Sequence, residues 1–137
     1  MIATRYLEFE TRAGEIRDIT REVATAVGGS GIASGLVTVF VPGATGAVTT
    51  IEHEDGLVKD MADLLERLIP ERREYAHNLR WHDGNGHSHL RASLLGPGLT
   101  IPLVEGILEI GEWQQIIFLE LDNRPRNRRI VVQIIGE

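Results

Sequence analysis

The sequence contains no cysteine and no long hydrophobic run. Because cysteine is absent, disulfide bonds, thiolate zinc sites and cysteine nucleophiles are excluded. No apolar run approaches the roughly 20 residues that a membrane-spanning helix needs. The amino terminus, MIATRYLEFE, alternates and carries charges, which is not the pattern of a signal peptide. We therefore expect a cytoplasmic protein that does not bind membranes.

Positive charge is also scarce. The chain has 14 Lys and Arg against 20 Asp and Glu, a formal net charge of −6. Generic nucleic-acid binding is not expected, because phosphate neutralisation needs clustered basic residues. The exception is NRPRNRR at 123–129, whose arginines could clamp a phosphate or pair with Glu120 and Asp122. We favour ion pairing for most of them, with one arginine reaching an anionic ligand.

A length of 137 residues with 42% hydrophobic content fits a single domain over residues 1–137. Hydrophobic periodicity predicts seven strands and three helical segments. The expected strands cover 2–11, 35–41, 47–54, 99–104, 106–110, 113–122 and 128–136, and the expected helices 18–29, 56–70 and 89–96. Few helices separate adjacent strands, which predicts an α+β fold with mainly antiparallel sheets packed with two or three helices.

Two hairpins are expected from the turn sequences. PGATG joins the strands at 35–41 and 47–54, and NRPRN joins those at 113–122 and 128–136. The last two strands are rich in Ile and Val, which favours a place at the centre of a sheet.

Histidines cluster in one glycine-broken segment. Three of the five lie in HDGNGHSHLR at 82–91, and His77 lies just upstream. If the chain is extended there, His87 and His89 point the same way and could hold one metal ion, with His77 as a third nitrogen ligand. Three nitrogen ligands with an open water position are typical of catalytic zinc.

Carboxylates could complete such a site. Glu52 and Asp60 are candidates for a ligand, an orienting group or a general base. Two alternatives remain open: the histidines could be polar loop residues that cap a helix, or a helix beginning near Ser88 could present an anion site in which His87, His89 and Arg91 bind phosphate. Metal and phosphate binding are compatible. The glycines and threonines of PGATGAVTT could also form an anion nest.

The chain resembles the YjbQ-like family, also called the secondary thiamine-phosphate synthase family. The resemblance rests on GLVTVFVPGATGAVTTIEHEDGLVKD at 35–60, YAHN at 75–78, NGHSHLRASLLG at 85–96 and the segment at 105–136. It implies a compact α+β domain that assembles as a homotrimer. It also implies a pocket that binds a divalent metal, zinc or magnesium, at the family's histidines, which fall on His77, His87 and His89.

The family's acidic positions fall on Glu52 and Asp60. Its members show a weak thiamine-phosphate synthase activity, which joins a pyrimidine pyrophosphate to a thiazole phosphate and releases pyrophosphate. Charge neutralisation of that leaving group by a metal ion, His87, His89 and Arg91 is chemically plausible.

One position departs from the family pattern. Many members carry a histidine followed by Thr-Thr or Thr-Ser after the first buried strand, where this chain has Gly43, Ala44 and Thr45. That histidine's role cannot be transferred to this chain. The sequence thus leaves two hypotheses: a metal-associated enzyme of phosphorylated small molecules, or a non-catalytic trimer that binds a metal ion or an anion.

Overall fold

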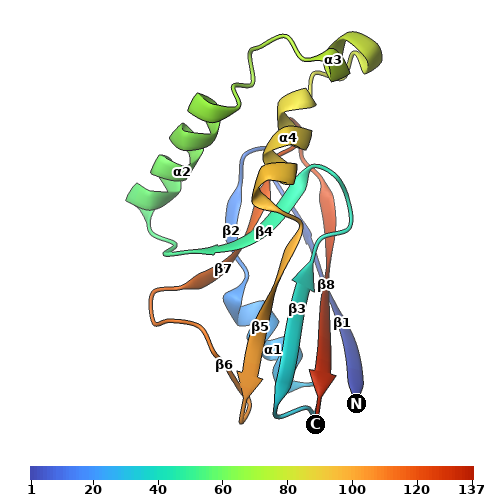
Figure 1. Cartoon of the computed structure of the whole chain (residues 1–137), viewed down its shortest axis with the longest axis vertical. Helices are drawn as coiled ribbons and strands as arrows, with labels where there is room; N and C mark the ends of the chain where they lie inside the picture. Colours follow the sequence, from blue (N-terminus) through green and yellow to red (C-terminus); the bar gives the residue numbers. More distant parts are fainter.

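The computed structural model describes residues 1–137 and contains two antiparallel sheets and four helices (Figure 1). The larger sheet has the order β1 (Ile2–Glu10), β8 (Asn127–Gly136), β3 (Gly35–Phe40), β5 (Gly98–Val104), β6 (Ile107–Leu108). The smaller sheet has the order β2 (Ile16–Asp18), β7 (Gln115–Glu120), β4 (Gly46–Ile51). The helices are α1 (Thr20–Gly28), α2 (Asp55–Leu68), α3 (Ala76–Trp81) and α4 (Gly86–Leu95).

The predicted α+β class with antiparallel sheets is confirmed. Two short elements were not predicted: β2 has three residues and α3 has six, too few for a periodicity to be recognised. The helix count is therefore four rather than two or three. None of the helices is both long enough and apolar enough to cross a membrane.

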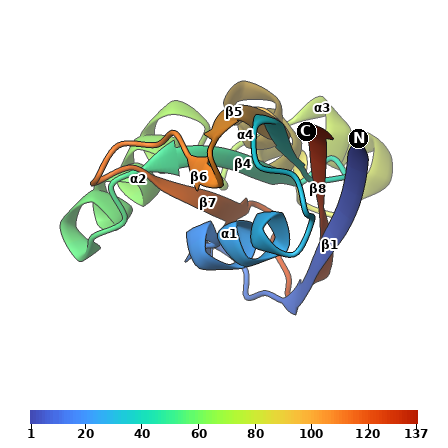
Figure 2. The ribbon, with the colours of Figure 1, turned by 90° about the horizontal axis from the view of Figure 1, so that it is seen from below.

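The main hydrophobic core lies between the inner face of the five-stranded sheet and a layer formed by α1 and one face of the three-stranded sheet (Figure 2). Val37 and Ile134 contribute from the large sheet, Val23 from α1 and Phe118 from β7, and each is completely buried. The opposite face of β7 packs on helices α2 and α4 in a second core.

Strand β7 is consequently buried on both sides. Ile116 and Phe118 point into the main core, whereas Ile117 and Leu119 point into the second. Successive side chains of a strand face opposite ways, so a strand between two cores is apolar at every position. This accounts for the uninterrupted IIFL run.

Both predicted hairpins are wrong. Strand β3 pairs with β5 and β8, and β4 pairs with β7, so the two strands that flank PGATG lie in different sheets. Likewise β7 pairs with β2 and β4, whereas β8 pairs with β1 and β3. At each turn the chain crosses from one sheet to the other. Glycine and proline mark where the chain turns. Which strands then pair depends on the burial of strand faces against parts of the chain that are distant in sequence.

Helix α2 is capped at its start by Glu54. The Glu54 carboxylate accepts hydrogen bonds from the backbone N–H groups of Gly56 (2.8 Å) and Leu57 (2.5 Å). Such a cap satisfies donors that have no partner inside the helix.

Figure 1 shows α2, α3 and α4 gathered at one end of the molecule, with both termini at the other.

A buried ion pair joins the two sheets. Arg128 of β8 donates from Nε to Glu120 Oε1 (2.7 Å) and from Nη2 to Oε2 (2.5 Å). The Glu120 side chain is fully buried and that of Arg128 is 4% exposed. Arg126 pairs with Asp122 and Arg129 with Glu8, so the ion pairing expected for most arginines of this segment is confirmed.

The pair makes Arg128 a sensitive position for stability. Replacing Arg128→Met should lower the free energy of unfolding by about 3–5 kcal/mol, because the Glu120 carboxylate would be left buried without a countercharge. Urea denaturation would measure this loss. Arg129→Met serves as the matched control: its contact with Glu8 is 3.6 Å long and exposed, so only a small change is expected. Equal losses in both variants would contradict a special role for the buried pair.

Candidate functional site

The histidine segment is helical where the metal hypothesis required an extended chain. His87 and His89 lie in the first turn of α4, which begins at Gly86. With 3.6 residues per turn, positions two apart point roughly 200° away from each other. His87 is 3% exposed and lines one cavity, whereas His89 lines a separate open groove. The condition under which His87 and His89 would point the same way is therefore not met, and the helix expected at 89–96 is confirmed.

His77 and His89 lie together. Their ring centroids are 4.5 Å apart, although they come from α3 and α4. His77 Nε2 is also 3.2 Å from Asp83 Oδ1. With its amide nitrogen facing this group, Asn85 donates to His77 Nε2 and to Asp83 Oδ1, each at 2.9 Å. Asp83 and Asn85 were missed from the sequence; their only signal is their position among the histidines.

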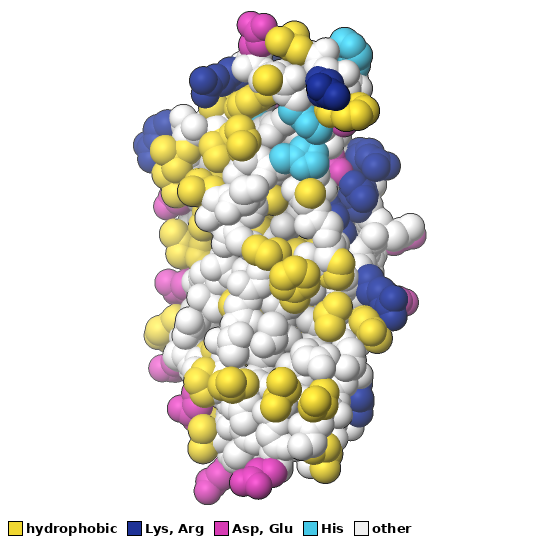
Figure 3. Space-filling view, turned by 45° about the vertical axis from the view of Figure 1, so that its right-hand side comes forward, with side chains coloured by type: hydrophobic (Ala, Val, Ile, Leu, Met, Phe, Trp, Pro, Cys, Tyr) yellow, Lys and Arg dark blue, Asp and Glu magenta, His cyan; other side chains and the backbone are white.

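A groove of about 490 Å³ opens beside this cluster. Figure 3 shows histidine side chains next to basic ones on this face of the molecule. We call it the arginine groove because three arginines and a single carboxylate supply its charge. It is lined by Pro42, Gly43, Ala44, Thr45, Asn85, His89, Asp122, Arg126, Asn127, Arg128 and Arg129.

The Gly43 turn leaves an arginine nitrogen open in the groove. Arg128 uses Nε and Nη2 for its hydrogen bonds to Glu120 and Thr45, and Nη1 makes none. A Cβ atom on Gly43 would lie 3.4 Å from that Nη1, and the φ angle of Gly43 is +131°, which L side chains rarely adopt. A glycine here therefore keeps the guanidinium edge accessible.

Asp122 is held rigidly on the groove wall. Its carboxylate accepts hydrogen bonds from Thr45 Oγ1 (3.2 Å), the Asn123 backbone N–H (2.8 Å) and Arg126. Burial raises the pKa of this carboxyl. The hydrogen bonds from Asn123 and Arg126 lower the pKa and outweigh burial, so the net result is a lowered pKa. Asp122 was considered from the sequence only as an ion-pair partner.

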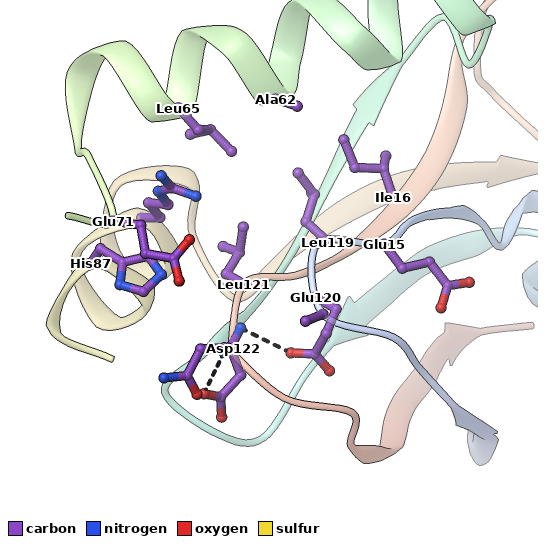
Figure 4. Close-up of a pocket in the computed structure, with 14 residues that line it drawn as sticks. Glu15, Ile16, Ala62, Leu65, Glu71, His87, Leu119, Glu120, Leu121 and Asp122 are labelled. Atoms are coloured by element: carbon purple, nitrogen blue, oxygen red, sulfur yellow. Dashed lines mark hydrogen bonds between the residues drawn. The ribbon is translucent and has the colours of Figure 1, made fainter. Parts of the chain in front are cut away.

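His87 and Arg91 line a separate cavity of about 220 Å³ between α2 and the three-stranded sheet (Figure 4). We call it the His87 cavity. Burial, and secondly the charge of Arg91, lowers the pKa of His87. Arg91 itself donates to the Ile69 carbonyl (2.9 Å) and to Glu66 (2.8 Å), so it ties α4 to the end of α2.

The other predicted residues lie elsewhere. Glu52 is exposed after β4 and Asp60 is exposed on α2, and neither lines the groove or the cavity. No group of three or more His, Asp or Glu side chains in the chain is arranged to hold a metal ion. The backbone N–H of Gly86, at the start of α4, donates to Asn78 Oδ1 (2.8 Å) and so is already occupied. Roles for Glu52, Asp60 and Arg91 in catalysis stay predictions.

Because the pKa of Asp122 is lower in the folded protein, its ionised form stabilises the fold above the ordinary carboxyl pKa, and this stability is lost as the pH falls. We expect urea unfolding to show a smaller loss of stability between pH 7 and about pH 3 for Asp122→Asn than for the unchanged protein. Asp60→Asn, on an exposed helix face, should keep the full loss. The same pH dependence in all three proteins would contradict this assignment.

Comparison with known proteins extends these observations. The family model described as "UPF0047 protein YjbQ-like" matches residues 5–137. A UPF0047 protein of Methanothermobacter thermautotrophicus is 41% identical over 137 residues, covering 99% of this chain and 94% of that protein. The UPF0047 protein YugU of Bacillus subtilis is 35% identical, covering 92% and 93%.

Solved structures show the same fold. The crystal structure of a YbjQ-like protein of unknown function from Sulfolobus solfataricus superposes with a TM-score of 0.90 at 35% identity, covering 100% of both chains. A YjbQ/UPF0047 family protein of Clostridium acetobutylicum gives a TM-score of 0.83 at 34% identity, covering 94% of this chain and 99% of that one. The match of sequence over nearly the whole chain, together with the shared two-sheet architecture, places this chain in the UPF0047 (YjbQ-like) family.

Proposed function

We propose that this protein is an enzyme that acts on a phosphorylated or pyrophosphorylated small molecule, whose phosphate binds in the arginine groove. The observation that carries the proposal is the free Nη1 of Arg128 beside Gly43. Arg128 is fixed by its buried pair with Glu120, so this donor is preorganised for an anion. Arg126 and Arg129 line the same groove and add positive charge.

The histidine pair supplies the groups for proton transfer. His89 lines the groove, the His77 ring lies against it at a tilt, and Asp83 and Asn85 contact His77. Histidine is the usual group for general acid–base chemistry near neutral pH, and the Asp83 carboxylate contacts His77, the neighbour of His89. A substrate whose phosphate lies on the arginines would therefore present its reacting end to His89.

The particular reaction that we propose is the thiamine-phosphate synthase reaction implied by the family resemblance. In that reaction the thiazole nitrogen donates its electron pair to the carbon of the pyrimidine that bears the pyrophosphate. The carbon–oxygen bond breaks, and the electron pair leaves with pyrophosphate. The protein would contribute proximity of the two rings and neutralisation of the leaving group by the groove arginines. His89 would donate a proton to the departing pyrophosphate, so the reaction needs a pocket, cations and a general acid rather than a nucleophilic side chain.

A divalent metal ion, zinc or magnesium, stays a prediction. The residues of one chain do not fit a three-histidine site, because His87 points away from His77 and His89. His77 and His89 provide two nitrogen ligands, and further ligands would have to come from a bound phosphate or from another subunit.

We also propose that the protein assembles as a homotrimer and acts in the cytoplasm. The outer face of the five-stranded sheet supports assembly: several large apolar side chains on it are about half exposed. They are Ile2, Tyr6, Leu36, Phe40 and Ile135. Strand pairing places Leu36 next to Ile135 and Ile135 next to Ile2, so these three side chains form one continuous apolar row across the sheet. A patch of this kind favours a protein interface.

The groove predicts pyrophosphate binding that depends on Arg126. Arg126→Gln should weaken pyrophosphate binding, measured by calorimetry, by about tenfold or more, since a charged hydrogen-bond partner is lost. Arg5→Gln, a surface change outside the groove, should leave it unchanged. His89→Asn should keep pyrophosphate binding but abolish turnover of the two thiamine precursors. Binding without any turnover in the unchanged protein would favour the non-catalytic alternative, and absence of binding would refute the groove.

The metal prediction is tested by metal analysis of the purified protein. If zinc or another divalent ion is bound at His77 and His89, the double variant His77→Ala/His89→Ala should lose it. His53→Ala is the control, since His53 hydrogen-bonds the Ile16 carbonyl and lies outside the cluster. Equal metal content in all three proteins would contradict the site.

The sheet face predicts the oligomeric state. Sedimentation equilibrium should give a trimer for the unchanged protein, and Leu36→Glu/Ile135→Glu should dissociate it, because two carboxylates would be buried in the interface. Leu79→Glu, at an exposed apolar position on α3, should leave the mass unchanged. A monomer for the unchanged protein at micromolar concentration would exclude the trimer.

A further inference from the structure

The His87 cavity lies between two walls that carry apolar side chains. Ala62 and Leu65 of α2 form one wall, and Ile16, Leu119 and Leu121 of the three-stranded sheet and its end form the other (Figure 4). These five side chains are apolar and face each other across about 220 Å³.

That volume limits the size of an occupant. An engineered apolar cavity of about 150 Å³ in another protein binds benzene, and pockets for drug-sized ligands usually measure about 300–1,000 Å³. The His87 cavity therefore has room for a single ring with a few small substituents. The apolar walls would cover both faces of such a ring and remove them from water.

His87 gives the cavity a specific polar feature. Its Nδ1 is the only buried side-chain nitrogen or oxygen of the chain without a hydrogen-bond partner. Its Nε2 has only a long contact, 3.5 Å, with Ser88 Oγ. Buried polar groups are nearly always paired, and an unpaired one calls for an explanation, such as a missing ligand. The histidine ring lines the cavity, and rotation of the ring would turn the covered Nδ1 toward an occupant, which could supply the absent partner.

The charges around the cavity exclude an anion. Four carboxylates line it, those of Glu15, Glu71, Glu120 and Asp122, against the single guanidinium of Arg91. Arg91 is already paired with Glu66. Three of the carboxylates are paired with arginines, and Glu71, which lies beside the His87 ring in Figure 4, has no such pair. The cavity thus differs in charge from the arginine groove.

From these features we infer that the His87 cavity is a second binding site, for a small uncharged or cationic nitrogen-containing ring that carries an N–H donor and a ring-nitrogen acceptor. The ring lies between α2 and β7, one of its nitrogens pairs with the His87 imidazole, and its N–H group faces Glu71. A ring with both a donor and an acceptor satisfies His87 in either tautomer. The site stands independently of phosphate binding in the groove.

The test uses 2-aminopyridine as the probe. In protein labelled with ¹⁵N-histidine, saturable binding should shift the imidazole nitrogen signals of His87, which are assigned from the loss of one set in His87→Leu. Benzoate has a similar size but a negative charge and should not bind. Toluene lacks the polar groups and should bind more weakly. Equal binding of benzoate, or no change at His87 at millimolar 2-aminopyridine, would overturn the inference.

A second variant tests the cavity without touching its polar groups. Ala62→Leu fills part of the cavity from α2 and should weaken 2-aminopyridine binding by about tenfold. Ala24→Leu makes the same change on the exposed surface of α1 and should have no effect. Unchanged affinity in Ala62→Leu would place the probe elsewhere and refute the site. Pyrophosphate binding should be unchanged in Ala62→Leu, so failure of the groove and failure of the cavity are separate results.

Discussion

The buried pair of Glu120 and Arg128 is the constraint on which the rest of the structure depends. It connects the last residue of β7 to the start of β8, and so fixes the two sheets to each other at the end where the candidate site lies. Charges buried this deeply are tolerated only when their hydrogen bonds are complete. Thr11 Oγ1 donates to the Glu120 carboxylate, and Thr45 Oγ1 accepts from Arg128 Nη2, so only Nη1 of the guanidinium is left without a partner. The same contacts hold the arginine whose free edge faces the groove.

Local features of the fold were predictable, whereas strand pairing was not. The apolar stripe of α2, the helix at 18–29 and the Ile- and Val-rich strands follow from periodicity within one segment. The two hairpins were wrong because PGATG and NRPRN can serve equally in a hairpin and in a crossover between sheets. Burial of β7 on both faces decided the outcome, and that depends on α1, α2 and α4 together.

For the candidate site, too, local features were predictable and tertiary contacts were not. Sequence spacing found His77, His87 and His89, and the resemblance found the family. Sequence spacing could not decide whether residues 87–89 are extended or helical. The helix directs His87 into the His87 cavity and His89, two positions later, into the arginine groove. Asp83 and Asn85 contact His77 only because the short loop between α3 and α4 folds back, with His82 and Gly84 at positive φ. Such tertiary geometry has no signature in a single sequence.

Asp122 lies on the wall that the arginine groove and the His87 cavity share. Its carboxylate is held by Thr45, Asn123 and Arg126, so a shift of any one of them would move a group that lines both the arginine groove and the His87 cavity. A ligand on one side that displaces Asp122 also changes the lining on the other side, and any resulting change in affinity is equal in both directions.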